Sequence, residues 1–208
     1  MNVVEIIAAI DEQLESPPPN PLGGSLMILV GLPGTGKSVV ASALQKRLPH
    51  VLVSTDTIRR VMTAAPSYSD EEKAQIYQLC FEIIERRLRR GQRVLFDAVN
   101  QLQIRRDQAA AVAVNLGLPA MFCYFQASPE AIKERLVQRN SANRRLGDMS
   151  DADWAVYNLL VETQEPMTNR HLILDSSSTS PEALADCLHA YWLKEEAAQW
   201  KRRSSTTP

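Results

Sequence analysis

The chain has 208 residues and a formal net charge of -1, with 45% hydrophobic and 23% charged residues. This composition is typical of one globular domain with its own core, and it excludes an intrinsically disordered chain. A charge so close to zero gives no general attraction to nucleic acid or to an anionic membrane, so an acidic partner would need a local basic patch.

The cysteines and the N-terminus indicate the compartment. Three cysteines lie far apart, without the close spacing of zinc or redox motifs, and we expect reduced, mostly buried thiols at Cys80, Cys123 and Cys187. No basic region precedes the first apolar residues, and no apolar run approaches the roughly 20 residues that span a bilayer. We therefore expect a cytoplasmic protein with no membrane partner.

The first 22 residues predict a helix followed by a stiff connector. Apolar residues recur at helical spacing, and the proline-rich segment 16–21 ends the helix. The apolar stripe consists of Val3, Ile6, Ile7, Ile10 and Leu14. It could pack on the domain that follows or on another subunit, and we favour packing on its own domain.

Residues 23–200 alternate between short apolar runs and longer amphipathic stretches. This pattern predicts an α/β fold with a five-stranded, mostly parallel sheet covered by helices on both faces. The expected strands are 26–30, 51–54, 93–97, 120–126 and 171–175. Ser69 and Glu72 form a capping-box pattern at the start of one helix. Residues 201–208 are polar and predict a flexible tail.

The octet Gly31–Ser38 matches the phosphate-loop pattern G-x-x-x-x-G-K-[ST], with an apolar strand before it and helical spacing after it. In that setting, backbone N–H groups and the positive end of the helix dipole converge on phosphates. Lys37 would reach the β- and γ-phosphates of ATP, and the Ser38 hydroxyl would coordinate Mg²⁺. The expected ATP-binding residues are Gly31, Leu32, Pro33, Gly34, Thr35, Gly36, Lys37, Ser38 and Val39.

Other motifs narrow the class of P-loop protein. The Asn-Lys-x-Asp segment with which GTPases read the base does not occur in the sequence. Asp97 ends an apolar run but is followed by Ala98, where many ATPase motors have a water-polarising Glu. A motor that hydrolyses ATP to do mechanical work is therefore disfavoured. Asp97 is predicted to bind Mg²⁺ through water. The alternative is that Asp97 caps the helix that contains Ile104.

Together, the P-loop, segment 54–60, segment 96–100 and an arginine-rich stretch near residue 140 resemble a known group. The chain is similar to the small P-loop kinases often labelled as AAA-type ATPase domains, which are related to polynucleotide 5′-kinases and zeta-toxin-like kinases. The resemblance covers about residues 25–195. It implies a three-layer P-loop NTPase fold of the nucleoside-kinase type.

In that group, the aspartate just beyond the second strand accepts the proton of the substrate hydroxyl, and the arginine three residues later holds substrate. Those positions are Asp56 and Arg59. A loop at the carboxyl edge of a parallel strand faces the same crevice as the P-loop, where a carboxylate can orient a hydroxyl towards the γ-phosphate. The alternative makes Asp56 the N-cap of a helix that begins at Thr57.

Further substrate contacts are predicted after the third strand. Relatives often have threonine where this chain has Val99, whereas Asn100 keeps a polar group. Arg105 and Arg106 follow near the expected crevice and are candidate substrate ligands. The denser basic cluster 86–90 lies at a helix end, where we expect an exposed face that stabilises the helix dipole.

A lid is predicted over residues 135–150. Arg135 and Arg139 lie four residues apart on one helix face, and an arginine-rich stretch follows. Closure would bring guanidinium groups onto the phosphates and exclude water. The resemblance favours Arg139 for the phosphate contact, with Arg135 second. The alternative is that both are solvated helix arginines.

The predicted function is ATP- and Mg²⁺-dependent transfer of the γ-phosphate to a hydroxyl of a small molecule or nucleotide. A nucleic-acid 5′-hydroxyl stays open but is not favoured, because no basic groove interleaved with aromatic residues is apparent in the sequence. The alternatives are an ATP-binding regulatory module and an ATPase without an acceptor. The sequence does not indicate an oligomeric state.

Overall fold

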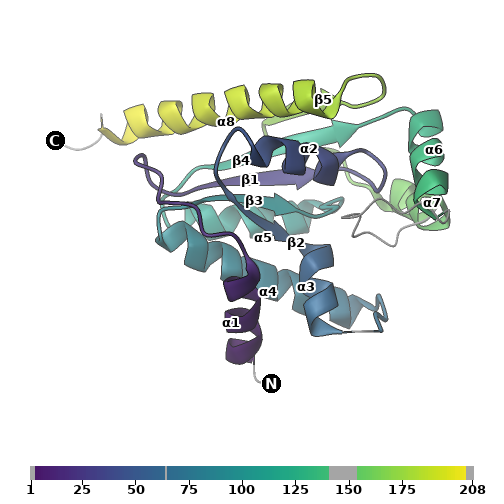
Figure 1. Ribbon diagram of the computed structural model, residues 1–208, viewed down its shortest axis with the longest axis horizontal. Coiled ribbons are helices and arrows are strands. Elements are labelled where there is room, and N and C mark those ends of the chain that lie inside the picture. Colours follow the sequence, from purple (N-terminus) through teal and green to yellow (C-terminus); the bar gives the residue numbers. More distant parts are fainter. Residues whose placement is uncertain (1–2, 64, 141–153, 205–208) are drawn as a thin grey trace.

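A five-stranded parallel sheet forms the centre of the protein (Figure 1). The computed structural model describes residues 3–63, 65–140 and 154–204. Within these residues the strand order is β2-β3-β1-β4-β5. The strands are β1 Ser25–Val30, β2 Val51–Ser54, β3 Arg93–Asp97, β4 Ala120–Gln126 and β5 His171–Asp175. The α/β fold class and all five predicted strands are confirmed, and only the start of β1 differs, by one residue.

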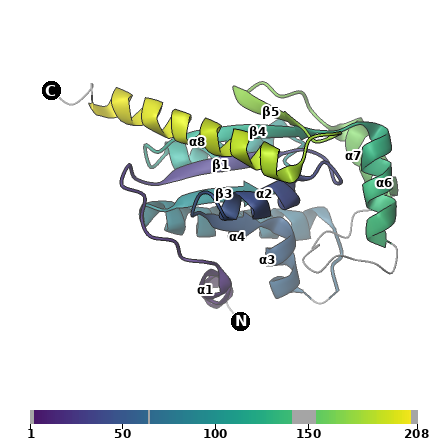
Figure 2. The same ribbon diagram turned by 45° about the horizontal axis from the view of Figure 1, so that its top comes forward.

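Helices cover both faces of the sheet. Helices α2 and α8 lie on one face, α1, α3, α4 and α5 lie on the other, and α6 and α7 lie beyond the carboxyl ends of the strands (Figures 1 and 2). Their bounds are α1 Val3–Gln13, α2 Lys37–Gln45, α3 Thr55–Met62, α4 Asp70–Arg89, α5 Gln103–Val114, α6 Pro129–Asn140, α7 Trp154–Thr163 and α8 Pro181–Ser204. Among the described residues, no helix combines the length and apolar character that crossing a bilayer would require.

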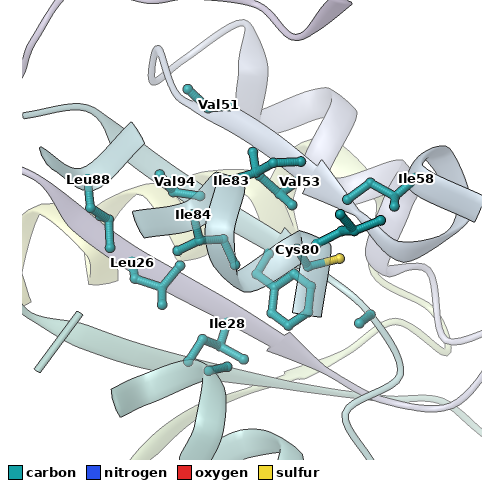
Figure 3. Packing of buried hydrophobic residues seen from close by; sticks show 14 of the residues in the cluster. Leu26, Ile28, Val51, Val53, Ile58, Cys80, Ile83, Ile84, Leu88 and Val94 are labelled. Carbon is teal, nitrogen blue, oxygen red and sulfur yellow. The ribbon is translucent and has the colours of Figure 1, made fainter. Parts of the chain in front are cut away.

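The strands are apolar on both faces because each face packs against helices. In β1, Leu26 and Ile28 point into the core under α4 and α5, whereas Met27 and Leu29 point into the core under α2 and α8. Figure 3 shows the first of these two cores, in which Leu26 and Ile28 of β1 lie with Val94 of β3 and with Ile83 and Ile84 of α4. The two cores together hold β1 rigidly in the middle of the sheet.

Two cysteines of the three fit the expectation of buried thiols. Cys80 and Cys123 are buried and unpaired, and burial raises the pKa of both thiols. Cys187 is also unpaired but exposed on α8, so the expectation is wrong for that residue.

The N-terminal helix packs on its own domain. Ile7 and Ile10 of α1 are each 1% exposed and belong to the core that also holds residues of α4. Asp11 forms an ion pair with Arg87, at 2.5 Å, and a second with Arg90, at 3.0 Å. The prediction that cluster 86–90 is an exposed face is therefore wrong for Arg87, which is 2% exposed because α1 covers it.

Candidate active site

The ends of three neighbouring strands meet at one level of the sheet. Leu29 of β1 and Ser54 of β2 both pair with Asp97 of β3. In the sheet, β3 and then β2 lie on one side of β1, and β4 and then β5 lie on the other side. Such a switch in strand order opens a crevice at the carboxyl edge of the sheet. The P-loop, Asp56 and Asp97 all lie at this edge.

The P-loop backbone is tightly folded. Gly31 donates its N–H to the carbonyl of Val99 at 3.0 Å, and the Thr35 hydroxyl donates to the carbonyl of Leu32 at 2.7 Å. Gly34 has a φ of 81°, and a Cβ added there would lie 3.0 Å from Cγ2 of Ile132 on α6. A glycine is required at this position because both the backbone angle and the space exclude a side chain.

The remaining P-loop residues differ in exposure. Leu32 and Pro33 are buried, whereas Ser38 and Val39, in the first turn of α2, are exposed. Gly36 is the N-cap of α2 and has a left-handed conformation, with a φ of 87°. The loop therefore leaves the amino end of α2 open to the crevice, which is the arrangement that binds phosphate.

Lys37 lies inside the loop rather than in solvent. Its side chain is 8% exposed, and its Nζ donates to the carbonyls of Gly31, at 2.7 Å, and Leu32, at 3.1 Å. These contacts hold a buried ammonium group at the base of the cradle. Lys37 is therefore not a solvated lysine in an ordinary turn.

Ser38 and Asp97 are brought together. The Ser38 hydroxyl donates to Oδ2 of Asp97 at 2.7 Å, and Asp97 is 6% exposed. Leu102, not Asp97, is the N-cap of α5, so the alternative role of Asp97 as a helix cap is wrong. A hydroxyl and a carboxylate at this distance fit the oxygen donors that Mg²⁺ prefers.

No larger metal cluster accompanies this pair. Among the described residues, no group of three or more His, Cys, Asp or Glu side chains could hold a metal ion. A metal ion between Ser38 and Asp97 would thus need further oxygen ligands from water or from bound phosphate. Mg²⁺ commonly binds in this way, through one or two protein ligands and substrate phosphates.

Asp56 lies in the first turn of α3 and is not its cap. Helix α3 begins at Thr55, and the Ser54 hydroxyl accepts the N–H of Asp56 at 3.3 Å. The alternative role of Asp56 as the N-cap is therefore wrong. Its carboxylate accepts from Nη1 of Arg59 at 3.0 Å, and the side chain is 33% exposed.

Glu72 completes an ion-pair chain with Asp56 and Arg59. Nε of Arg59 donates to Oε1 of Glu72 at 3.0 Å. The Ser67 hydroxyl donates to Oε2 at 2.7 Å, and this bond, together with backbone donors and Arg59, lowers the pKa of Glu72 to about 2. The sequence assigned Glu72 only to a helix cap, and no local signal indicated its bond to Arg59.

The side chains of Asn100 and Arg106 are buried and form hydrogen bonds within the protein. Asn100 is 0% exposed, with a φ of 50°, and its amide donates to the carbonyl of Leu29 at 2.7 Å. Arg106 is also 0% exposed and donates to the carbonyls of Asn100, Gln101 and Pro166. The interpretation of Arg106 as a substrate ligand is wrong, because its guanidinium joins two loops. Asn100 is equally buried and braces the end of β1, so the structure does not place it in contact with substrate as predicted.

Arg135 contacts the P-loop directly. Its Nη1 donates to the carbonyl of Gly34 at 3.0 Å and to the Ser176 hydroxyl at 2.9 Å. Ser176 follows β5 and itself donates to the carbonyl of Thr35 at 2.9 Å. Arg135 is therefore not a solvated helix arginine. Arg139 lies on α6 with its side chain outside the described part, and residues 141–150 of the predicted lid also lie outside the described residues.

Helices α6 and α7 pack over the P-loop through a small apolar cluster. Leu32 of the loop contacts Ile132 and Leu136 of α6 and Tyr157 of α7. Trp154 stacks on Tyr157 with ring centroids 4.8 Å apart. The two aromatic residues thus form part of a core that anchors the helices beside the loop.

Comparison with known proteins is consistent with this geometry. A family model described as AAA domain matches residues 26–167. The chain belongs to this AAA domain family. The APS kinase of Mycobacterium tuberculosis, solved with AMPPNP and APS, is similar in structure, with 18% identity and a TM-score of 0.64 over 85% of this chain and 99% of that chain.

Two further structures resemble this AAA domain protein. Kti12 of Chaetomium thermophilum, solved with ADP-AlF3, is 20% identical, with a TM-score of 0.64 over 82% of this chain and 98% of that chain. A gluconokinase of Sinorhizobium meliloti 1021 is 18% identical, with a TM-score of 0.54 over 89% and 96%. No curated protein matches the chain in sequence. At these identities the structural likeness shows a shared P-loop fold.

Proposed function

We propose that the protein is an ATP- and Mg²⁺-dependent phosphotransferase that moves the γ-phosphate to a hydroxyl of a small molecule or nucleotide. The observation that supports this most is the strand register at the candidate site. Because Ser54 pairs with Asp97, the Asp56 carboxylate follows on the same edge as the Ser38–Asp97 pair. A general base, metal ligands and a phosphate cradle then face one crevice.

The P-loop supplies the ATP site in this proposal. Backbone N–H groups of Gly31–Ser38 and the amino end of α2 would bind the phosphates, with Val39 beside them. Lys37 would leave its carbonyl acceptors for the β- and γ-phosphates. Ser38 and Asp97 would hold Mg²⁺, which when bound neutralises charge on the phosphate oxygens.

Arginines of α6 complete this half of the site. Arg135 already touches the carbonyl of Gly34, so it is close enough to contribute positive charge to a bound nucleotide. Arg139, one helical turn further along α6, would contact the transferred phosphate. Both groups would offset the negative charge that builds up during transfer.

Asp56 would act on the acceptor. The acceptor oxygen attacks the γ-phosphorus, the bond from that phosphorus to the leaving oxygen of ADP breaks, and the hydroxyl proton passes to Asp56. Arg59 fixes the direction of this carboxylate through the 3.0 Å ion pair. Glu72 holds Arg59 from the other side, so Arg59 contacts substrate while its own position is set by two carboxylates.

The test uses purified protein, γ-labelled ATP, Mg²⁺ and a panel of hydroxyl acceptors that includes 5′-hydroxyl oligonucleotides. Asp56→Asn should lower transfer about 100-fold or more while ATP affinity stays unchanged, since general base catalysis contributes at least that factor. Lys37→Ala should weaken binding of Mg-ATP itself. Equal transfer by wild type and Asp56→Asn would refute the assigned role of Asp56.

The same assay separates the other functions. Label released as inorganic phosphate without an acceptor would identify an ATPase. Binding of Mg-ATP without any turnover would identify a regulatory module. Failure of the intact protein to bind Mg-ATP would overturn the proposal as a whole.

A further inference from the structure

Arg105 carries a positive charge that no carboxylate among the described residues balances. Its hydrogen bond goes to the neutral Oε1 of Gln108 at 3.3 Å. By contrast, Arg59 forms ion pairs with Asp56 and Glu72. Arg105 is only partly exposed, so its charge has lost some of its hydration without gaining an anion.

An aromatic platform fixes the Arg105 guanidinium. Its central carbon lies 4.6 Å from the centroid of the Tyr77 ring, a distance typical of a cation–π contact. The Tyr77 hydroxyl donates to Oδ1 of Asn100 at 3.3 Å, and Asn100 donates to the carbonyl of Leu29 at 2.7 Å. A chain of contacts therefore runs from the end of β1 to the charge of Arg105.

This platform lies on the acceptor side of the candidate site. Asn100 follows β3 three residues after Asp97. Burial raises the pKa of the Tyr77 hydroxyl, whereas the charges of Arg105 and Arg59 both act to lower it. Arg105 lies over the Tyr77 ring, and Arg59 contacts Asp56.

The guanidinium is also accessible. Arg105 lines a groove of about 400 Å³ between α4 and α5, together with Gln78, Phe81 and Gln108 and with Glu85 and Arg89, which pair with each other. This volume is within the range of sites that bind small molecules. A ligand in the groove could reach the edge of the guanidinium, because Tyr77 covers only its face.

A planar guanidinium with a free edge binds oxyanions through two parallel N–H···O bonds. An anionic acceptor placed beside Asp56 would need such a countercharge, since Arg59 is already shared by two carboxylates. We propose that Arg105 binds an anionic group of the acceptor. The phosphoacceptor then carries a phosphate, sulfate or carboxylate besides the hydroxyl that is phosphorylated. The class of acceptor rests on the proposed phosphotransferase function, whereas the anion site can be tested without turnover.

The first test titrates sodium sulfate into protein saturated with Mg-AMPPNP, so that the P-loop is filled, at ionic strength held constant with chloride. Binding is followed by NMR chemical shifts in wild type, Arg105→Gln, Arg105→Lys and the control Arg170→Gln. Arg170 is a suitable control because its side chain is 70% exposed and pairs with Glu195. Thermal melting of each variant checks that it is folded.

We expect Arg105→Gln to weaken sulfate binding about tenfold or more, because a charged hydrogen bond is lost. Arg105→Lys should retain part of the affinity, while Arg170→Gln and the affinity for Mg-AMPPNP should not change. Sodium acetate in place of sulfate distinguishes a site for tetrahedral anions from one for carboxylates. Equal sulfate binding by wild type and Arg105→Gln, or no binding by wild type, would overturn the proposal.

The second test compares acceptors in matched pairs with and without an anionic group, such as glycerol with glycerol 3-phosphate and a nucleoside with its monophosphate. Transfer should favour the anionic member of each pair. Arg105→Gln should raise the KM for the anionic acceptor about tenfold or more and leave kcat within about threefold, because the lost contact stabilises the bound acceptor and the transition state equally. Preference for neutral acceptors would refute the inference. Absence of transfer to any acceptor would refute the phosphotransferase function, and the sulfate titration would still decide the role of Arg105.

Discussion

Removal of the Asp11 carboxylate should destabilise the protein strongly, although Asp11 lies on a helix outside the matched family region. Arg87 is 2% exposed, and without Asp11 its remaining side-chain partners are the neutral Ser16 hydroxyl, at 3.1 Å, and Gln92 Oε1, at 3.4 Å. Removing one partner of a buried ion pair costs about 3–5 kcal/mol. At about 2–4 °C per kcal/mol, the melting temperature of Asp11→Ala should fall by roughly 6–20 °C.

Urea unfolding with linear extrapolation measures this loss, provided that the m-value is unchanged. Asp70→Ala is the matched control, because Asp70 pairs with Lys73 but is 94% exposed, and it should cost about 1 kcal/mol or less. The double variant Asp11→Ala/Arg87→Met should recover part of the stability, since no charge is then left buried. If Asp11→Ala costs no more than Asp70→Ala, the argument that α1 is docked on α4 through a buried ion pair is refuted.

Two further perturbations test the P-loop and the ion-pair chain. Gly34→Ala and Gly23→Ala both place alanine at a positive φ, which costs about 1–2 kcal/mol of stability. Only Gly34→Ala should also weaken Mg-ATP binding in calorimetry, because the added Cβ at Gly23 has 3.8 Å of space and lies away from the loop. Equal nucleotide affinity of the two variants would contradict the role of Gly34. The lowered pKa of Glu72 means that its stabilising effect is complete above its ordinary pKa of 4.5 and is lost as the pH falls towards about 2. The stability difference between wild type and Glu72→Gln should therefore shrink across that window in urea unfolding, and a difference independent of pH would contradict the ion-pair chain.

Local sequence predicted the elements whose signal is contained in neighbouring residues. The strands were predictable because continuous apolar runs such as 26–30 are stable only between two layers of helices. The P-loop was predictable because its glycines, Lys37 and Ser38 must occupy fixed positions between a strand and a helix. The alternation of strands and helices also predicted a parallel sheet, which places Asp56 and Asp97 at the same edge.

Cap positions were less predictable, because several polar residues near a helix start can serve. For segment 54–57, the alternative prediction made Asp56 the cap of a helix that begins at Thr57, and the sequence did not exclude it. The structure assigns the cap to Ser54, which leaves the Asp56 carboxylate to pair with Arg59. A shift of two residues in the helix start thus separates a structural role from a chemical one.

The sequence by itself determined the sheet, the phosphate cradle and the edge at which chemistry can occur, because these depend on local periodicity and on a motif of fixed spacing. Only the tertiary structure decided the environment of the arginines. Arg87 and Arg106 are buried with partners, while Arg105 keeps an unbalanced charge on Tyr77. The physical reason is that the hydration and pairing of a long charged side chain depend on residues distant in sequence, such as Asp11 for Arg87 and Pro166 for Arg106.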